Sequence, residues 1–176
     1  MADLRYPIGT FTYDGAMNDG RRAECLARIA AAPARLRAAV AGLDDARLDT
    51  PYRPGGWTVR QVIHHVADSH VNAYTRIRLA LTEDTPTIKP YEEARWAELP
   101  DARTLPVEIS LTLLDGLHAR WVALLQRLGA DHVGRRLRHP EHDRLMTIDE
   151  LIAMYAWHGD HHTAHVTSLR ERLGWR

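Results

Sequence analysis

The sequence contains a single cysteine among its 176 residues, which excludes an internal disulfide framework. Cys25 lies among alanines and an isoleucine in a stretch with helical spacing. This setting predicts a small buried side chain rather than a catalytic nucleophile. An unpaired thiol of this kind is typical of a reducing compartment, so we expect a cytoplasmic protein.

A net charge and long apolar runs are also missing from the sequence. Lysine and arginine together number 23, as do aspartate and glutamate, so no overall field attracts nucleic acid or an anionic membrane. One short basic cluster, Arg135, Arg136 and Arg138, is followed by acidic residues, and we expect no nucleic-acid partner. No stretch approaches the roughly 18 apolar residues of a membrane span, and the N-terminus lacks a signal-peptide pattern, so we expect no membrane partner.

The alternation of apolar and polar residues that marks a strand is absent from the sequence, so the chain is predicted to be all-α. Four helical segments are expected, at about residues 18–43, 58–83, 106–128 and 147–173. Pro33 should kink or divide the first segment. Thr58 with Gln61 forms a capping-box pattern at the start of the second segment, and Thr147 with Glu150 does so for the fourth.

The segment between the second and third predicted helices is unusually long. It reads DTPTIKPYEEARWAELPDARTLP, over twenty residues with four prolines, whereas about 2 to 8 residues join antiparallel neighbours in a bundle. A long crossover that joins parallel helices explains this length. We therefore expect one domain, residues 1–176, folded as a four-helix bundle with a crossover between helices 2 and 3.

Seven of the eleven histidines fall in two of the predicted helices. They are His64, His65 and His70 in the second, and His158, His161, His162 and His165 in the fourth. Residues four apart on a helix share a face, with Cβ atoms about 5 to 6 Å apart, so two imidazoles at that spacing can bind one metal ion. The alternative is a group of histidines that bond to threonine or backbone groups, or that form a polar end of the bundle.

The apolar pattern of the fourth helix separates its histidines. Steps of three and four from Ile148 reach His158 and His162, so these two continue the buried stripe. Two buried imidazoles need partners for their nitrogens, and a metal ion supplies one to both. His165 lies in the stripe one turn further on, as a possible neighbour of the ligands, whereas His161 leaves the stripe and is expected to face outward.

In the second helix the apolar pattern gives no single third ligand. His70 lies within the apolar stripe, His65 lies on its flank, and His64 points most nearly outward. Periodicity alone therefore leaves both His65 and His70 as candidates for the third ligand.

Two segments, GGWTVRQVIHHVADSH and YAWHGDHHTAH, together resemble the DinB-like superfamily, most closely its YfiT-type branch of metal-dependent hydrolases. The likeness extends from Tyr6 to Trp175, nearly the whole chain. It implies a four-helix bundle with up-down-down-up topology and a homodimeric assembly. It also implies a metal triad of one histidine from the second helix and two from the fourth, which by position are His65, His158 and His162.

Three imidazole nitrogens leave a coordination position open, as in catalytic zinc sites. We expect one divalent ion per subunit, zinc or nickel, and a small-molecule substrate hydrolysed by activated water. In the zincin motif a glutamate follows the first helical histidine as general base, but here Gly159 follows His158. Asp68, three residues after His65, is a candidate base or a partner that orients an imidazole, unless it is an ordinary surface carboxylate.

Two other functions stay open at this point. The missing base favours transfer of a low-molecular-weight thiol, because a metal ion deprotonates a bound thiol directly. Some members of the superfamily resemble S-transferases that use bacillithiol or mycothiol on electrophiles. The third possibility is a binding module without catalysis, in which the ion only stabilises the fold and its coordination shell is closed.

Overall fold

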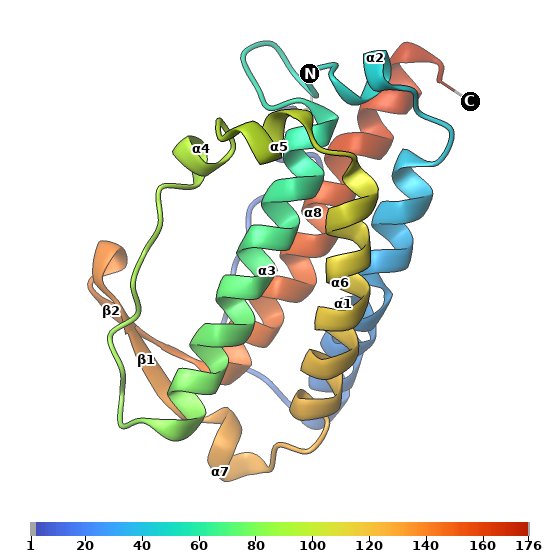
Figure 1. The fold of residues 1–176 in the computed structure, drawn as a ribbon. Helices are drawn as coiled ribbons and strands as arrows, with labels where there is room; N and C mark the ends of the chain where they lie inside the picture. The colour runs from blue at the N-terminus through green and yellow to red at the C-terminus, as the bar shows by residue number, and fades with distance from the viewer. Residues whose placement is uncertain (1–2, 176) are drawn as a thin grey trace.

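The computed structural model describes residues 3–175, and its four long helices lie side by side as a bundle (Figure 1). These are α1 (Asp19–Val40), α3 (Val59–Thr82), α6 (Val107–Leu125) and α8 (Ile148–Leu173). Helices α1 and α8 run in one direction and α3 and α6 in the other, so the order is up-down-down-up. Helix α1 packs against α6 and α8, and α3 packs against the same two. The predicted bundle is confirmed.

Helix boundaries follow local chemistry. At α3 the Thr58 side chain accepts from the Gln61 backbone N–H, and the Gln61 side chain accepts from the Thr58 N–H, which completes the predicted capping box. The Thr147 hydroxyl accepts from the N–H of Glu150 at the start of α8. Pro33 does not divide the first helix, because α1 continues through it to Val40. Its place among the buried residues of α1 shows that packing outweighs the lost backbone bond.

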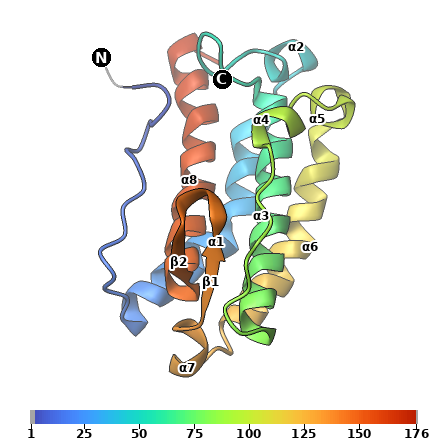
Figure 2. The same cartoon turned by 90° about the vertical axis from the view of Figure 1, so that its left-hand side faces the viewer.

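The crossover runs the length of α3 and carries two short helices, α4 (Glu93–Trp96) and α5 (Pro100–Thr104). Beside it lies an antiparallel hairpin, β1 (Arg136–His139) with β2 (Arg144–Thr147) (Figure 2). The Ile88 N–H donates to the Arg138 carbonyl at 3.1 Å, so the crossover pairs with β1. The chain is mostly helical, as expected, and this hairpin is a short addition that the sequence did not indicate. Strands of four residues are too short for their alternation to stand out in a sequence.

The remaining short elements are α2 (Asp45–Leu48), α7 (Ala130–Val133) and a 3-10 turn at Pro140–His142. The N-terminal segment, residues 3–17, extends alongside α8 (Figure 2). Within residues 3–175 no helix has both the length and the apolar character needed to span a membrane.

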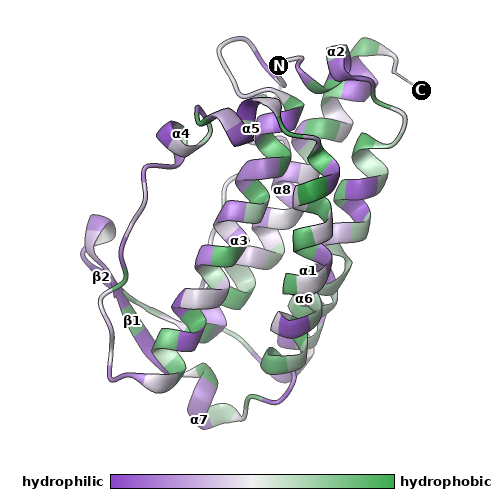
Figure 3. Ribbon diagram, viewed as in Figure 1, coloured by the Kyte–Doolittle hydropathy of each residue, from purple (hydrophilic) through white to green (hydrophobic). Residues whose placement is uncertain are grey.

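The core consists of two hydrophobic clusters. One surrounds Trp121 and Ile148, and the other surrounds Val62 and Leu114. The long helices carry mixed hydrophobic and hydrophilic residues, whereas the crossover is largely hydrophilic (Figure 3). Along α8 the four histidines fall between Ala156 of the first cluster and Val166 of the second, so a polar layer separates the two clusters on this helix.

Candidate metal centre

Three histidines converge where α3 faces α8. His65 comes from the second turn of α3, and His158 and His162 lie one turn apart on α8. One ring nitrogen from each can be chosen so that all three lie within 4.8 Å of one another. The ring centroid of His65 lies 5.5 Å from that of His158 and 4.8 Å from that of His162. The structure therefore brings together the three residues that the resemblance implies.

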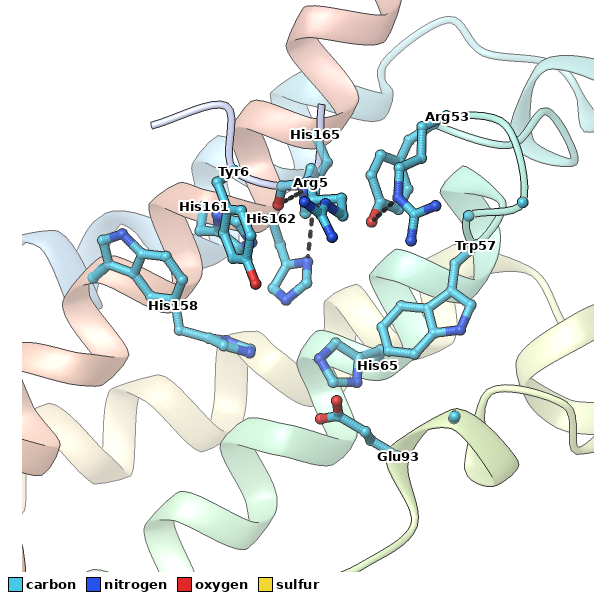
Figure 4. Close-up of a pocket in the computed structure, with 15 residues that line it drawn as sticks. Arg5, Tyr6, Arg53, Trp57, His65, Glu93, His158, His161, His162 and His165 are labelled. Carbon is cyan, nitrogen blue, oxygen red and sulfur yellow. Dashed lines mark hydrogen bonds between the residues drawn. The ribbon is translucent and has the colours of Figure 1, made fainter. Parts of the chain in front are cut away.

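These imidazoles open into a pocket of about 460 Å³ (Figure 4). Three separate segments form its walls: the N-terminal segment contributes Arg5, the loop before α3 contributes Arg53 and Trp57, and the crossover contributes Glu93. Trp157 lines it from α8. The pocket is open to solvent at one side, so a small molecule can approach the three histidines.

Burial keeps the three rings neutral near pH 7. Desolvation, with smaller contributions from His165 and His161, lowers the pKa of His65 to about 4. Desolvation and the nearby rings hold the pKa values of His158 and His162 well below the usual range. Neutral imidazoles have a free lone pair, which is the form that binds metal ions.

This burial predicts acid destabilisation of the metal-free protein. His65 has a pKa of about 4 in the folded chain and 6.5 as its ordinary value, so its contribution is complete above about pH 6.5 and is lost as the pH falls toward 4. We expect the free energy of unfolding to decrease by about 3 kcal/mol from His65 alone. Urea unfolding of the metal-free protein across this window measures it. A constant free energy would contradict a neutral buried His65.

Behind the α8 histidines, further rings occupy their other nitrogens. His70 Nε2 lies 3.1 Å from His158 Nδ1, and His70 Nδ1 lies 2.8 Å from His118 Nε2. His165 Nδ1 lies 3.3 Å from His162 Nδ1. His70 is fully buried, so it belongs to the core as its register predicted, and it lies behind the site. His118 has helical spacing with Leu114 and Trp121, which places it on the buried face of α6, but no local pattern shows that it meets His70.

Two histidines expected to face outward are buried instead. His161 is 6 % exposed and stacks on Trp157 with ring centroids 4.3 Å apart, beneath the N-terminal segment that carries Tyr6. His64 is also 6 % exposed and lies 2.7 Å from the hydroxyl of Ser110. Helical periodicity identifies only the face that meets the bundle. It does not reveal a face that a loop or a neighbouring helix end covers.

Gly159 occupies a crowded contact between α1 and α8. A Cβ added there would lie 3.1 Å from the Ala32 Cβ and 3.8 Å from His70 Cε1. A glutamate after His158, as in zincins, would need this same space. Close packing therefore explains why the base of that motif is absent.

The carboxylate that lines the pocket is not Asp68. Asp68 lies outside the pocket lining, and desolvation raises its pKa to about 6. Among the described residues of the lining, Glu93 is the one acidic side chain. It lies at the exposed mouth, with its carboxylate pointing toward His65 (Figure 4), and desolvation raises its pKa. Sequence reasoning missed Glu93, because a crossover has no periodicity from which to place a side chain.

Comparison with known proteins identifies the family. Residues 28–166 match the sequence profile of the DinB superfamily. The chain belongs to the DinB superfamily. This DinB-superfamily chain is 54% identical over 175 residues to a protein of Bacillus mycoides provisionally named a metal-dependent hydrolase, with 99% of this chain and 100% of the relative covered. A Bacillus cereus protein with the same provisional name has the same identity and coverage.

A solved structure agrees with the computed fold of this DinB-superfamily chain. YfiT from Bacillus subtilis is described as "a probable metal-dependent hydrolase with an unusual four-helix bundle topology". It is 44% identical, with a TM-score of 0.97, and the match covers 99% of this chain and 100% of YfiT. The family resemblance and the bundle predicted from sequence are thus confirmed.

Proposed function

We propose that the chain is a metal-dependent hydrolase that holds one divalent ion with His65, His158 and His162. The observation that carries this proposal is the convergence of three neutral imidazoles within 4.8 Å at the side of an open pocket. The donor set fits a catalytic ion, because three protein nitrogens leave room for water or substrate. Imidazole ligands suit zinc or nickel. The provisional names of the relatives point to the same reaction class.

A divalent ion at this site would polarise a carbonyl or phosphoryl group and lower the pKa of water. The chain's own residues supply the other requirements. The Glu93 carboxylate faces the pocket and is placed to take a proton from the attacking water, and its raised pKa brings it closer to neutral pH. Trp57, whose ring centroid lies 4.6 Å from that of His65, shields one side of the site from bulk water.

The pocket walls indicate the kind of small molecule that fits. Arg5 and Arg53 both line the pocket. Arg5 is paired with Asp3 at 2.8 Å, whereas within residues 3–175 Arg53 has no carboxylate partner. The unpaired guanidinium of Arg53 favours a substrate with a negatively charged group beside the bond that is cleaved. We therefore expect the substrate to be a small ester or amide that also carries an acidic group, such as a carboxylate.

The test of the proposal compares metal-free and reconstituted protein. Elemental analysis of the protein as purified identifies the ion, and a panel of small carboxylic esters and amides, acidic and neutral, is then assayed for hydrolysis. We expect metal to restore hydrolysis, with acidic compounds preferred. A protein that binds the ion stoichiometrically but hydrolyses none of the panel at a metal-dependent rate would contradict the hydrolase proposal.

Thiol transfer is the second candidate, because the unpaired guanidinium of Arg53 also suits a thiol that carries carboxylates, such as bacillithiol. Monochlorobimane mixed with bacillithiol and the metal-loaded protein distinguishes the two reactions. A metal-dependent rate of conjugation would favour transfer over hydrolysis. The non-catalytic alternative predicts a closed shell of four protein ligands, which the absorption spectrum of the cobalt-loaded protein would reveal.

We also infer that two copies of the chain associate as a homodimer. The α6 side chains of Ile109 and Leu113 are 54 % and 50 % exposed and lie four residues apart on one face, which supports an apolar contact there. Light scattering after size-exclusion chromatography should give twice the monomer mass. Leu113→Glu should shift the protein to the monomer. A monomeric wild type would contradict the inference.

A further inference from the structure

Two hydrogen-bonded chains connect the α8 histidines to backbone carbonyls. The first leads from His158 through His70 to His118, whose Nδ1 lies 2.7 Å from the carbonyl oxygen of Ile29 on α1. The second leads from His162 to His165, whose Nε2 lies 3.0 Å from the carbonyl oxygen of Arg5. Both chains end at a group that can only accept a hydrogen bond.

The carbonyl at the end of the first chain determines where every proton in it lies. His118 must donate from Nδ1 to Ile29, and a neutral ring has one donor and one acceptor, so its Nε2 accepts. His70 must then donate from Nδ1, and its Nε2 accepts from Nδ1 of His158. The Nε2 atom of His158 is left with a free lone pair.

Pro33 explains why the Ile29 carbonyl is available. In an α-helix the carbonyl of residue 29 would accept from the N–H of residue 33, but a proline has no N–H. The carbonyl therefore lacks its usual helical donor, and the His118 ring takes that place at 2.7 Å. Pro33, which the sequence suggested would kink or divide the helix, thus leaves the Ile29 carbonyl free to accept from His118 while α1 stays continuous.

The second chain leads to the same result independently. His165 must donate from Nε2 to the Arg5 carbonyl, so its Nδ1 accepts from Nδ1 of His162. His162 is left with a lone pair on Nε2, as His158 is. The segment that supplies this carbonyl is the N-terminal one, which lies against α8 (Figure 2).

We propose that His118, His70 and His165 are positioning residues that hold His158 and His162 in the Nδ1–H tautomer, so that both present Nε2 to the ion. Free neutral histidine favours the opposite Nε2–H form, which blocks that nitrogen. Partners that orient ligand histidines this way typically change metal affinity by 10- to 100-fold when they are lost. The ligand role rests on the proposed function, whereas the tautomers belong to the metal-free protein.

Nitrogen-15 NMR of the metal-free protein, with labelled histidine, tests the proposal directly. Long-range proton–nitrogen correlations near pH 7 report which ring nitrogen carries the proton. We expect Nδ1–H for His158, His162, His70 and His118, and Nε2–H for His165. An Nε2–H ring at His158 or His162 would overturn the proposal, whether or not the protein binds metal. Expected tautomers in a protein that binds no metal would instead refute the metal site alone.

Paired variants of His118 separate positioning from packing. His118→Phe keeps a ring but removes the acceptor for His70, and we expect zinc affinity to fall about 10- to 100-fold. His118→Gln places an amide oxygen near the Nε2 position and should keep both the His158 tautomer and the affinity. His64→Phe is the matched control, because His64 is equally buried but bonds Ser110 outside both chains. Equal losses of zinc affinity in His118→Phe and His64→Phe would contradict the proposal. If a variant fails to fold, the tautomers measured in the wild-type protein still test the proposal.

Discussion

His162→Ala is expected to lower zinc affinity by more than about 100-fold, beyond the loss that follows removal of an outer partner. The substitution removes one of the three converging nitrogens, and the remaining two imidazoles compete poorly with water for the ion. His158→Ala should behave in the same way, and both should abolish metal-dependent hydrolysis. Competition with a chromophoric chelator measures the affinity, and circular dichroism checks the fold.

His161→Ala is the matched control for these two variants. His161 lies on the same helix, is as buried as His162 and lines the same pocket, but its ring stacks on Trp157 and lies outside the group of converging nitrogens. We expect its zinc affinity to stay near that of the wild type. Equal losses in all three variants would show that the two α8 ligands have been assigned to the wrong face of that helix.

Glu93→Gln is expected to lower kcat by about 100- to 10,000-fold, the range that a lost general base typically costs. Metal affinity should not change, because Glu93 lies outside the converging nitrogens. The raised pKa of Glu93 also predicts that wild-type activity declines with falling pH at a higher pH than for an ordinary glutamate, and that this limb of the pH profile is lost in the variant.

Two neighbouring carboxylates serve as controls for Glu93. Glu92→Gln changes the exposed side chain that precedes it in the crossover and should leave kcat near the wild-type value. Asp68→Asn tests the residue that the sequence offered as a candidate base, which lies outside the pocket lining. A large loss of kcat in Asp68→Asn, together with a normal Glu93→Gln, would reverse the assignment of the base.

The candidate site also depends on segments that belong to none of the four long helices. Arg5 lies in the N-terminal segment, Arg53 in the loop before α3, and Glu93 in the crossover. The bundle holds the three imidazoles rigidly, whereas these segments supply the charges around them. Differences in substrate preference among relatives should therefore follow the loops, because loops tolerate substitution better than packed helices.

Signals that are local in the chain were enough to predict the features that repeat along a helix. Hydrophobic spacing and capping residues predicted the four long helices, and the length of the crossover predicted parallel neighbours, because these signals are local in the chain. The spacing of His158 and His162 likewise placed both on one buried face. The choice of His65 over His70 came from resemblance to a family, since the two residues are equally compatible with the periodicity.

Which side chains from different segments meet became known from the three-dimensional fold. The contact of His118 with His70, the burial of His161 beneath the N-terminal segment, and the position of Glu93 all join residues far apart in the chain. The pairing of the crossover with β1 is of the same kind. Helical periodicity specifies the rotation of one helix about its own axis, but loops and neighbouring helices have no such repeat. Their placement follows from packing of the whole chain, which no single segment encodes.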